Sequence, residues 1–304
     1  MSNLNGVIPV LKPPGMTSSD VVTFIKRTLN MKKVGHSGTL DPGASGVLCV
    51  CVGRATKISD YLMNSDKEYI ARFEAGTSTD TLDSYGKKKE YSECVISSSE
   101  FSSAKNDFLG NTEQIPPAYS AVKINGNPLY KYARKNIIPD QSKIKKRNIY
   151  VSSIDLINLT EKSFEIKIKC SKGTYIRTLC CDIAEKCGCI GYVSFLLRTQ
   201  ASGFDIKQCY TLEEIRYMSE NNSYEFVTPI GNALTKMNRV NLDSYLFRII
   251  TTGSPINLEK ISNPDDFADK DNLVYCKGEL IGIGHTEDNF FKLDTMLYQE
   301  GIRL

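Results

Sequence analysis

Two stretches of the chain alternate apolar and polar residues with the period of a β-strand. In residues 69–75 and again in residues 164–170, every second side chain is apolar or small, and most of those between are charged. Period-two alternation is typical of an antiparallel sheet with one covered face. The continuous apolar run at residues 47–52 predicts a further strand.

Helix signals are found before, between and after these strands. Ser18 or Ser19 can cap a helix whose apolar positions run from Val21 to Leu29. A second helix is predicted from about Thr178 to Lys186, ending before a glycine. A Thr-x-x-Glu capping box at residues 211–214 predicts a third. Strands and helices that mix without βαβ regularity favour an α+β fold with a mostly antiparallel sheet.

The end of the chain differs from the rest in charge and pattern. Residues 1–240 hold 32 basic and 24 acidic side chains, whereas residues 241–304 hold 6 basic and 11 acidic ones. Short apolar pieces separated by Gly and Pro occur in the second part, at residues 246–250, 273–276, 280–283 and 290–293. The pattern predicts a large domain over residues 1–235 and a small β-rich domain over residues 238–304.

Composition limits the class of protein. The chain has 304 residues, of which 41% are hydrophobic and 24% charged, which excludes disorder, collagen and coiled coil. The longest clean apolar run is far shorter than the roughly 20 residues of a membrane span, and the N-terminus lacks the pattern of a signal peptide. Ten cysteines in a chain of this length fit reduced thiols. We therefore expect a cytoplasmic protein with no membrane contact.

A basic segment occupies residues 120–150, where eight cations accompany one anion and tyrosines are interleaved. Cations neutralise phosphates and aromatic rings stack on bases, so this composition suits contact with RNA or DNA. A solvated, lysine-rich surface loop explains it equally well. The cations are Lys123, Lys131, Arg134, Lys135, Lys143, Lys145, Lys146 and Arg147.

Three loops carry candidate chemistry. Residues 35–46 place Asp41 in a Gly/Pro turn before the apolar strand, where it is either a turn residue or a nucleophile held in fixed geometry. Residues 76–86 hold Asp80 and Asp83, which are either an acid/base pair or Asx-turn residues. The Lys-Gly-Thr at residues 172–174 is either an anion site or an ordinary strand–helix turn.

Metal binding is not favoured by the cysteine and histidine spacing. The cluster Cys180, Cys181, Cys187 and Cys189 does not match paired C-x2-C zinc motifs. The chain has only two histidines, which are far apart in sequence. Buried thiols are the favoured interpretation.

The order of these motifs along nearly the whole chain closely resembles the tRNA pseudouridine-55 synthases, the TruB family. The resemblance rests on GVIPVLKPPGMTS (6–18), GHSGTLDPGASG (35–46), DKEY (66–69), GTSTDTLDSYG (76–86), QIPPAYSAVK (114–123), CSKGTYIRT (170–178) and LLRT (196–199). It implies a pseudouridine-synthase fold with a PUA-like RNA-binding domain over residues 238–304. It also implies isomerisation of one T-loop uridine of tRNA to pseudouridine after base flipping, without cofactor or metal.

The resemblance implies three catalytic residues. Asp41 corresponds to the nucleophile, which would overturn its interpretation as a plain turn residue. Tyr69 corresponds to the active-site tyrosine that stacks on the target base and is a candidate for proton transfer. Arg177 corresponds to the basic residue that pairs with the nucleophilic carboxylate and holds it ionised.

The resemblance also implies substrate-binding residues. Tyr175 corresponds to a second aromatic in the pocket, Leu196 to an apolar residue that lines it, and His36 to a histidine that props the T-loop open. Asp83 is expected to support Arg177. Where many relatives read Leu-Arg-Arg-Thr, this chain has Leu197 in place of the first arginine, which questions one phosphate contact.

The basic segment at about residues 119–147 corresponds to an insertion that grips the T-arm, through Lys143, Lys145, Lys146 and Arg147. Its presence favours a stand-alone, monomeric tRNA enzyme that needs no protein partner. Two alternatives remain: a guide-RNA-dependent synthase of the same superfamily, and a tRNA-binding or folding factor. The intact Asp41, Tyr69 and Arg177 argue against the second.

Overall fold

A central nine-stranded sheet organises the larger part of the chain. The computed structural model describes residues 4–135, 137 and 144–299. Neighbouring strands are antiparallel except for the short parallel pairing of β12 with β3, so the predicted α+β fold with a mostly antiparallel mixed sheet is confirmed. In order across the sheet the strands are β1 (Gly6–Lys12), β3 (Ser45–Val52), β12 (Gly191–Ala201), β4 (Lys67–Ala75), β11 (Ser163–Cys170), β10 (Arg147–Thr160) and β7 (Gly110–Gln114), with β2 (Val34–His36) on β3 and β13 (Phe204–Asp205) on β12.

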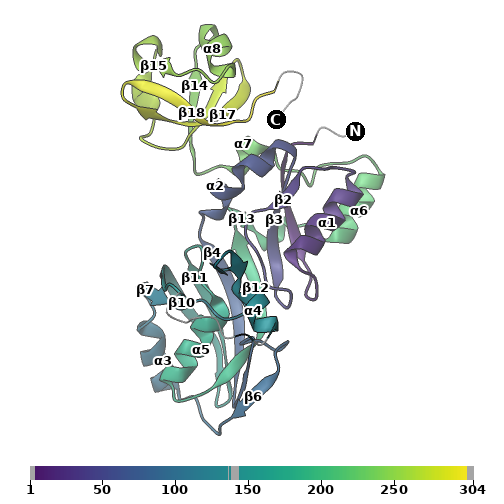
Figure 1. The fold of residues 1–304 in the computed structure, drawn as a ribbon, viewed down its shortest axis with the longest axis vertical. Helices are drawn as coiled ribbons and strands as arrows, with labels where there is room; N and C mark the ends of the chain where they lie inside the picture. The colour runs from purple at the N-terminus through teal and green to yellow at the C-terminus, as the bar shows by residue number, and fades with distance from the viewer. Residues whose placement is uncertain (1–3, 136, 138–143, 300–304) are drawn as a thin grey trace.

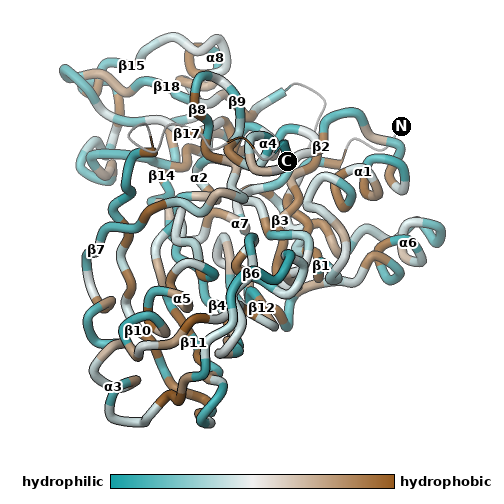
Figure 2. Tube along the Cα trace, turned by 60° about the horizontal axis from the view of Figure 1, so that its bottom comes forward, coloured by the Kyte–Doolittle hydropathy of each residue, from teal (hydrophilic) through white to brown (hydrophobic). Residues whose placement is uncertain are grey.

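One face of this sheet is covered and forms the main core. Along β4, Tyr69, Ala71 and Phe73 are buried, as the alternation predicts, and Phe73 stacks on Phe164 of β11 with ring centroids 4.9 Å apart. The helices α3 (Ser98–Asn106) and α5 (Ile176–Lys186) pack on this face (Figure 1). Figure 2 shows hydrophilic residues along the edge strand β7 and along β6 (Lys88–Tyr91).

The helices differ from the prediction at their first residues. The cap of α1 (Ser18–Thr28) is Thr17, whose side chain and that of Asp20 form a capping box. Ser18 is buried instead and bonds to the backbone of Leu40, which explains why it does not cap. The helix α5 begins two residues before the predicted start. The capping box that precedes α6 (Leu212–Glu220) is confirmed.

A second, five-stranded sheet follows in the last part of the chain (Figure 1). The apolar piece at residues 246–250, expected in a β-rich region, is instead mostly the helix α8 (Phe247–Thr251), because Leu246 and Ile250 are four residues apart and both buried. The strands are β14 (Asn238–Leu242), β16 (Asn272–Cys276), β17 (Glu279–Glu287), β18 (Phe290–Met296) and β15 (Ile256–Asn257), in sheet order.

The two sheets are joined through a shared apolar cluster. Val7 and Cys49 of the large sheet belong to the same buried cluster as Leu273, Ile283 and Leu297. The helices α2 (Ser59–Met63) and α7 (Ile230–Ala233) lie between the sheets (Figure 1). The guanidinium of Arg54 donates to the backbone oxygens of residues 297 and 298 at 2.7 and 2.6 Å.

Smaller elements complete the described chain. No helix in residues 4–135, 137 and 144–299 is long and apolar enough to span a membrane. The remaining elements are β5 (Thr77–Thr79), β8 (Lys123–Ile124), β9 (Asn127–Pro128), α4 (Leu129–Arg134) and the 3-10 turns Gly53–Ile58, Ile206–Gln208, Ser244–Leu246, Leu258–Lys260 and Pro264–Asp266.

Candidate active site

Asp41 lies in a turn that is held from several sides. The buried hydroxyl of Ser18 accepts a hydrogen bond from the backbone N–H of Leu40 at 2.9 Å and donates to its carbonyl at 3.0 Å. The backbone N–H of Ala44 donates to the carbonyl of Asp41 at 3.1 Å. The Asp41 side chain is 36% exposed. The turn is therefore rigid while its acid stays accessible.

A buried lysine supports the same turn. Lys12, from the end of β1, donates from Nζ to the carbonyls of Pro13 at 2.8 Å and Pro42 at 3.3 Å. Burial lowers the pKa of this ammonium from 10.5 to about 8, against the opposing attraction of Asp41. Lys12 therefore keeps a positive charge near the Asp41 carboxylate at neutral pH.

Arg177 forms the centre of the polar cluster. It extends from the first turn of α5, its side chain is 5% exposed, and its Nε lies 2.8 Å from Oδ2 of Asp41. Its Nη1 lies 3.4 Å from Oδ2 of Asp83 and also donates to the carbonyl of Thr81, while Nη2 donates to the carbonyl of Tyr119 at 3.2 Å. The nearly buried guanidinium therefore contacts two carboxylates and two carbonyls at once, and it holds both carboxylates in place.

The loop at residues 76–86 supplies the second carboxylate. Oδ1 of Asp83 accepts from the backbone N–H of Tyr85 at 3.0 Å and from the hydroxyl of Thr81. The backbone of the loop bonds to both the N–H and the carbonyl of Val193 in β12. Asp83 thus forms an Asx turn and also reaches Arg177. Asp80 instead accepts from the backbone of residue 87 and takes part in the fold of the loop.

Tyr69 is buried, unlike the partly exposed Asp41. It is 7% exposed, and burial raises the pKa of its hydroxyl. Its partner across the strand pair is Arg198 of β12, which is fully buried and lowers the pKa of Tyr69 by a smaller amount. The Arg198 guanidinium donates to the carbonyls of Val47 at 2.8 Å, Thr39 at 3.2 Å and Gly38 at 3.3 Å.

Sequence reasoning assigned no role to Arg198, although it lies in the LLRT motif. The signal available was a charged residue directly after two leucines in a sequence that now proves to be a central strand. Two of its three bonds join β12 to the segment that leads into Asp41, and the third joins it to β3, which follows Asp41. Arg198 therefore links the Asp41 turn to the strand pair that carries Tyr69.

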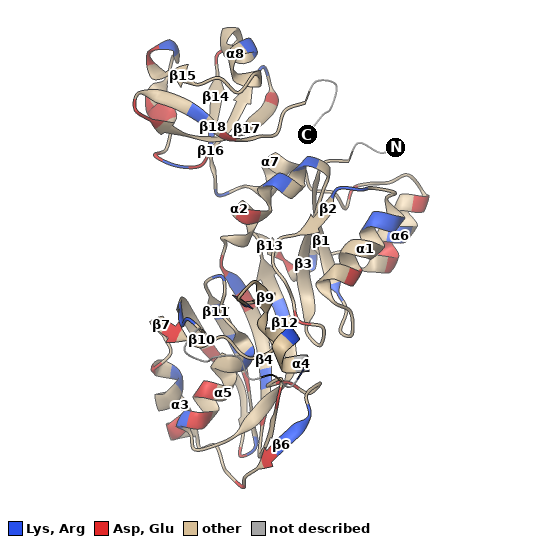
Figure 3. Ribbon diagram, viewed as in Figure 1, with Lys and Arg blue, Asp and Glu red and all other residues tan. Residues whose placement is uncertain are grey.

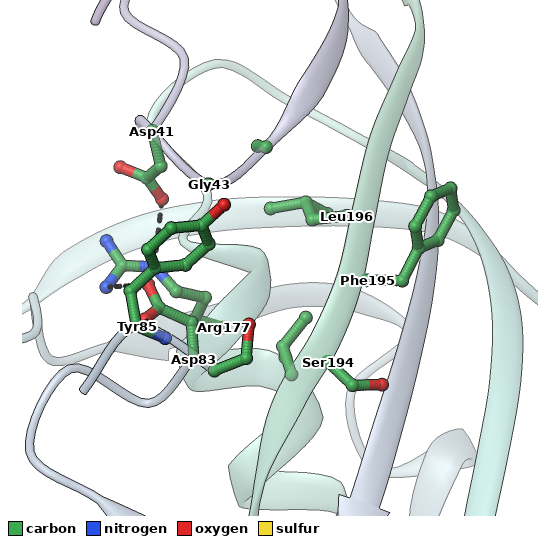
Figure 4. Close-up of a pocket in the computed structure, with 11 residues that line it drawn as sticks. Asp41, Gly43, Asp83, Tyr85, Arg177, Ser194, Phe195 and Leu196 are labelled. Carbon is green, nitrogen blue, oxygen red and sulfur yellow. Dashed lines mark hydrogen bonds and ion pairs between the residues drawn. The ribbon is translucent and has the colours of Figure 1, made fainter. Parts of the chain in front are cut away.

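A shallow pocket opens beside the ion pair (Figure 4). Leu196 points into it from β12, whereas Phe195 points to the other side of the strand. Among described residues, Tyr69, Tyr175 and His36 do not line it. The lining residues are Asp41, Gly43, Ala44, Asp83, Ser84, Tyr85, Arg177, Val193, Ser194, Phe195 and Leu196.

Two further predicted residues are held near the site by backbone contacts. Tyr175 precedes α5, and its N–H and carbonyl bond to the side-chain amide of Gln114 at 2.8 and 3.0 Å. His36 is in β2, and its Nδ1 is buried without a hydrogen-bond partner among the described residues. Burial, and then Arg198, lower the pKa of His36, so its ring is neutral at pH 7.

The described basic residues of the predicted RNA-gripping segment do not line the pocket. Nζ of Lys146 is 3.1 Å from the carboxylate of Glu113, and both side chains are exposed. Lys145 and Arg147 are exposed too, whereas Lys143 lies outside the described residues. Figure 3 shows further cations on β6, and acids together with cations on α3 and α5.

Side chains that could bind a metal ion are not clustered in the described part of the chain. No group of three or more His, Cys, Asp or Glu side chains in residues 4–135, 137 and 144–299 is placed to hold an ion. All ten cysteines are free, and Cys180, Cys187 and Cys189 are buried.

Comparison with known proteins identifies the family. Residues 26–176 match the TruB family pseudouridylate synthase N-terminal domain, and residues 177–238 match the tRNA pseudouridylate synthase B C-terminal domain. The tRNA pseudouridine synthase B of Alkaliphilus oremlandii is 38% identical over 306 residues, covering 98% of this chain and all of the relative. The chain belongs to the TruB family. The resemblance inferred from the motifs is therefore confirmed.

Further relatives of this TruB-family chain agree in sequence and in fold. The tRNA pseudouridine synthase B of Clostridium tetani is 42% identical over 299 residues, covering 97% of this chain and all of the relative. A chain in the crystal structure of a Cbf5-Nop10-Gar1 complex superimposes with a TM-score of 0.73 at 23% identity, covering 96% of this chain and 85% of that one. The second likeness concerns the fold alone, and it agrees with the expected pseudouridine-synthase fold.

Proposed function

We propose that this chain isomerises a uridine of tRNA to pseudouridine, acting at position 55 in the T-loop, with Asp41 as the nucleophile. The observation that carries the proposal is the Asp41 carboxylate, held 2.8 Å from the buried Arg177 at the edge of a pocket and still partly open to solvent. Membership of the TruB family supports the substrate class.

The target base is stacked inside an RNA loop, so the enzyme must extrude it at a cost of a few kcal/mol. Leu196 is proposed to receive the extruded uridine on the β12 side of the pocket. Tyr175 and His36, which lie nearby, are proposed to contact the RNA around it. Asp83 is proposed to act through Arg177, because its carboxylate fixes the guanidinium that orients Asp41.

The reaction moves one bond and one proton. The bond from the ribose C1′ to N1 of the base breaks, the base turns, and a bond from C1′ to C5 forms. C5 loses its proton and N1 gains one, so the nucleoside is neither oxidised nor reduced, and we propose that the chain uses no cofactor or metal. Asp41 assists the first bond cleavage, and the hydroxyl of Tyr69 is a candidate for proton transfer.

Holding two detached fragments in one pocket is mainly a matter of position and charge. Arg177 orients the Asp41 carboxylate, Lys12 binds the carbonyl of the next residue, Pro42, and the buried Arg198 holds the preceding backbone. These contacts are made within the protein, so they need not be created when RNA binds.

We propose that the rest of the chain contributes to tRNA binding. The basic segment at about residues 119–147 would grip the T-arm through Lys143, Lys145, Lys146 and Arg147. The sheet in residues 238–304 would act as a PUA-like RNA-binding domain after a catalytic domain over residues 1–235. The enzyme would work in the cytoplasm as a monomer without a protein partner.

The deciding experiment replaces Asp41 with Asn, which keeps the size of the side chain and removes its charge. Turnover on a tRNA transcript should vanish while tRNA binding survives. Asp60→Asn, an exposed position on α2, makes the same chemical change away from the pocket and should leave turnover intact. Asp41→Asn activity within tenfold of the parent would contradict the assignment.

The same assay separates the alternatives. Pure protein and bare transcript are incubated, and carbodiimide mapping locates any pseudouridine. A guide-RNA-dependent synthase would need an added RNA, and a tRNA-binding or folding factor would bind without any product. Product at a position other than 55 would contradict the proposed site on the tRNA.

A further inference from the structure

A large aromatic side chain stands exposed at the mouth of the pocket. Tyr85 keeps 64% of its surface in solvent, although it lines the same pocket as Asp41, Arg177 and Leu196. Figure 4 shows its ring in front of Arg177, between Asp41 and Leu196 in this view. A molecule that reaches Asp41 through this mouth passes along the ring.

The backbone of Tyr85 is fixed by the polar cluster. Its N–H donates to Oδ1 of Asp83 at 3.0 Å, and the following Gly86 donates to the Asp83 carbonyl at 3.2 Å. The other carboxylate oxygen of Asp83 lies 3.4 Å from Arg177. The position of the ring is therefore tied to the group that orients Asp41.

The ring also packs on the turn that carries Asp41. A Cβ added to Gly43 would lie 2.4 and 2.6 Å from two ring atoms of Tyr85. Gly43 does not have the positive φ that favours glycine, so the close ring is the reason that a side chain does not fit there. The contact sets one edge of the ring against the protein and leaves the rest of it in water.

An exposed ring beside a site for an extruded base provides a stacking platform. Tyr69 differs in this respect, because it is only 7% exposed and does not line the pocket. We propose that Tyr85 stacks on the extruded uridine at the pocket mouth and holds it for Asp41. This inference rests on the proposed function, because it takes the ligand to be a flipped uridine.

The sequence allows a direct optical test, because the chain has no tryptophan. Tyr85→Trp, made together with Asp41→Asn to prevent turnover, places a single reporter at the mouth. Its fluorescence should be quenched by the tRNA transcript, and the quenching should be lost with a transcript that is abasic at the target position. Tyr217→Trp, on α6 and 69% exposed, is the matched control and should give no such difference.

Kinetics of the single variants give an independent readout. Tyr85→Ala should raise the tRNA concentration that half-saturates the single-turnover rate by about 5- to 150-fold, the range for the loss of one stacked base. Tyr85→Phe keeps the ring and should restore most of that affinity. Thermal unfolding of both variants checks that the pocket still folds.

Three results would overturn the inference. The first is equal quenching of the Trp fluorescence by the intact and the abasic transcript. The second is no quenching although filter binding shows that a complex forms. The third is a half-saturating tRNA concentration for Tyr85→Ala that equals that of the parent. Failure of the proposed function gives a different result, because the unmodified protein would then make no pseudouridine. The fluorescence comparison in the Asp41→Asn background does not depend on turnover.

Discussion

At the scale of single residues, the site combines a partly exposed carboxylate, Asp41, with a nearly buried guanidinium, Arg177. Asp41 can meet a substrate because its turn is at the surface, while Arg177 is shielded and holds two carboxylates at once. Removing one partner from such a cluster leaves a buried charge unpaired, which costs more than the contact itself is worth. Asp41, Asp83 and Arg177 therefore act as a unit.

Tyr69 tests whether a hydroxyl takes part in the chemistry. Tyr69→Phe keeps the ring and its packing in the core but removes the group that faces Arg198 across the strands. If the hydroxyl transfers a proton, the single-turnover rate should fall by about 10²–10⁴-fold with little change in tRNA affinity. Rapid-quench kinetics at saturating tRNA measure this. A single-turnover rate and an affinity equal to those of the parent would show that the hydroxyl takes no part and would leave Tyr69 with a role for its ring alone.

Lys12 should make stability depend on pH in the alkaline range. Its pKa in the folded protein is about 8, below the 10.5 of an exposed lysine, so above pH 8 the unfolded chain binds more protons. The free energy of unfolding of the parent should therefore rise, relative to Lys12→Met, from about pH 8 to about 10.5. Urea unfolding of both proteins at several pH values measures the difference. Lys67, whose pKa is also about 8, is present in both and cancels. A difference that stays constant across this range would contradict the burial of a charged Lys12.

Sequence motifs identified the residues of the ion-pair cluster around Arg177. They did not identify the residues whose roles depend on contacts between distant parts of the chain. Asp41, Arg177 and Asp83 were indicated by motifs, and the structure brings them together. Arg198 and Tyr85 lie inside the family motifs, yet the motifs alone gave them no role. The role of Arg198 depends on which strands are neighbours in the sheet. The role of Tyr85 depends on its ring packing against a turn 42 residues earlier. Neither is a local property of the sequence.

At the scale of elements, the position of β12 between β3 and β4 decides the geometry of the site. Alternation predicted β4 and β11, because each has one covered face. No strand was predicted at residues 191–201, where the pairing with β4 has two register irregularities that disturb the period. Its insertion between two strands that are neighbours in sequence is a long-range feature that periodicity does not contain.

Gly46 tests how closely β3 and β12 must approach. It has a φ of +110°, and an added Cβ would lie 2.2 Å from the carbonyl oxygen of Arg198. Gly46→Ala should therefore lower the free energy of unfolding by more than the roughly 1–3 kcal/mol of backbone strain alone. Gly76→Ala changes a glycine of nearly the same φ, +103°, where an added Cβ would meet no atom closer than 3.7 Å, so it isolates the contribution of backbone strain. Equal losses in the two variants, by denaturant unfolding, would mean that the strands can move apart freely.

At the scale of the whole molecule, charge is distributed unevenly between the regions that tRNA would meet. The exposed cations at residues 145–147 lead into β10, which starts at Arg147, whereas residues 241–304 are acidic. Because phosphate neutralisation releases counterions, these two regions should contribute differently to the salt dependence of binding.

Changing Lys143, Lys145, Lys146 and Arg147 together to Gln should weaken tRNA binding and reduce the salt slope by roughly one for each phosphate that is no longer neutralised. The single-turnover rate at saturating tRNA should barely change, because the described members of the set lie outside the pocket. Changing Lys105, Lys162 and Lys186 to Gln removes cations near α3 and the far end of α5 and serves as the control. An unchanged salt slope in the variant with four Gln substitutions would show that the basic segment is only a solvated loop.

The insertion of β12 also sets the time at which a newly made chain acquires its site. Asp41 and Tyr69 leave the ribosome early, but the strand that separates and aligns β3 and β4 is not synthesised until residues 191–201, nearly two thirds of the way along the chain. Until then, Arg198 cannot hold the backbone before Asp41, and Leu196 cannot form its wall of the pocket. A ribosome-bound fragment that stops short of β12 would therefore possess Asp41 without the wall of the pocket in which we propose that the uridine binds.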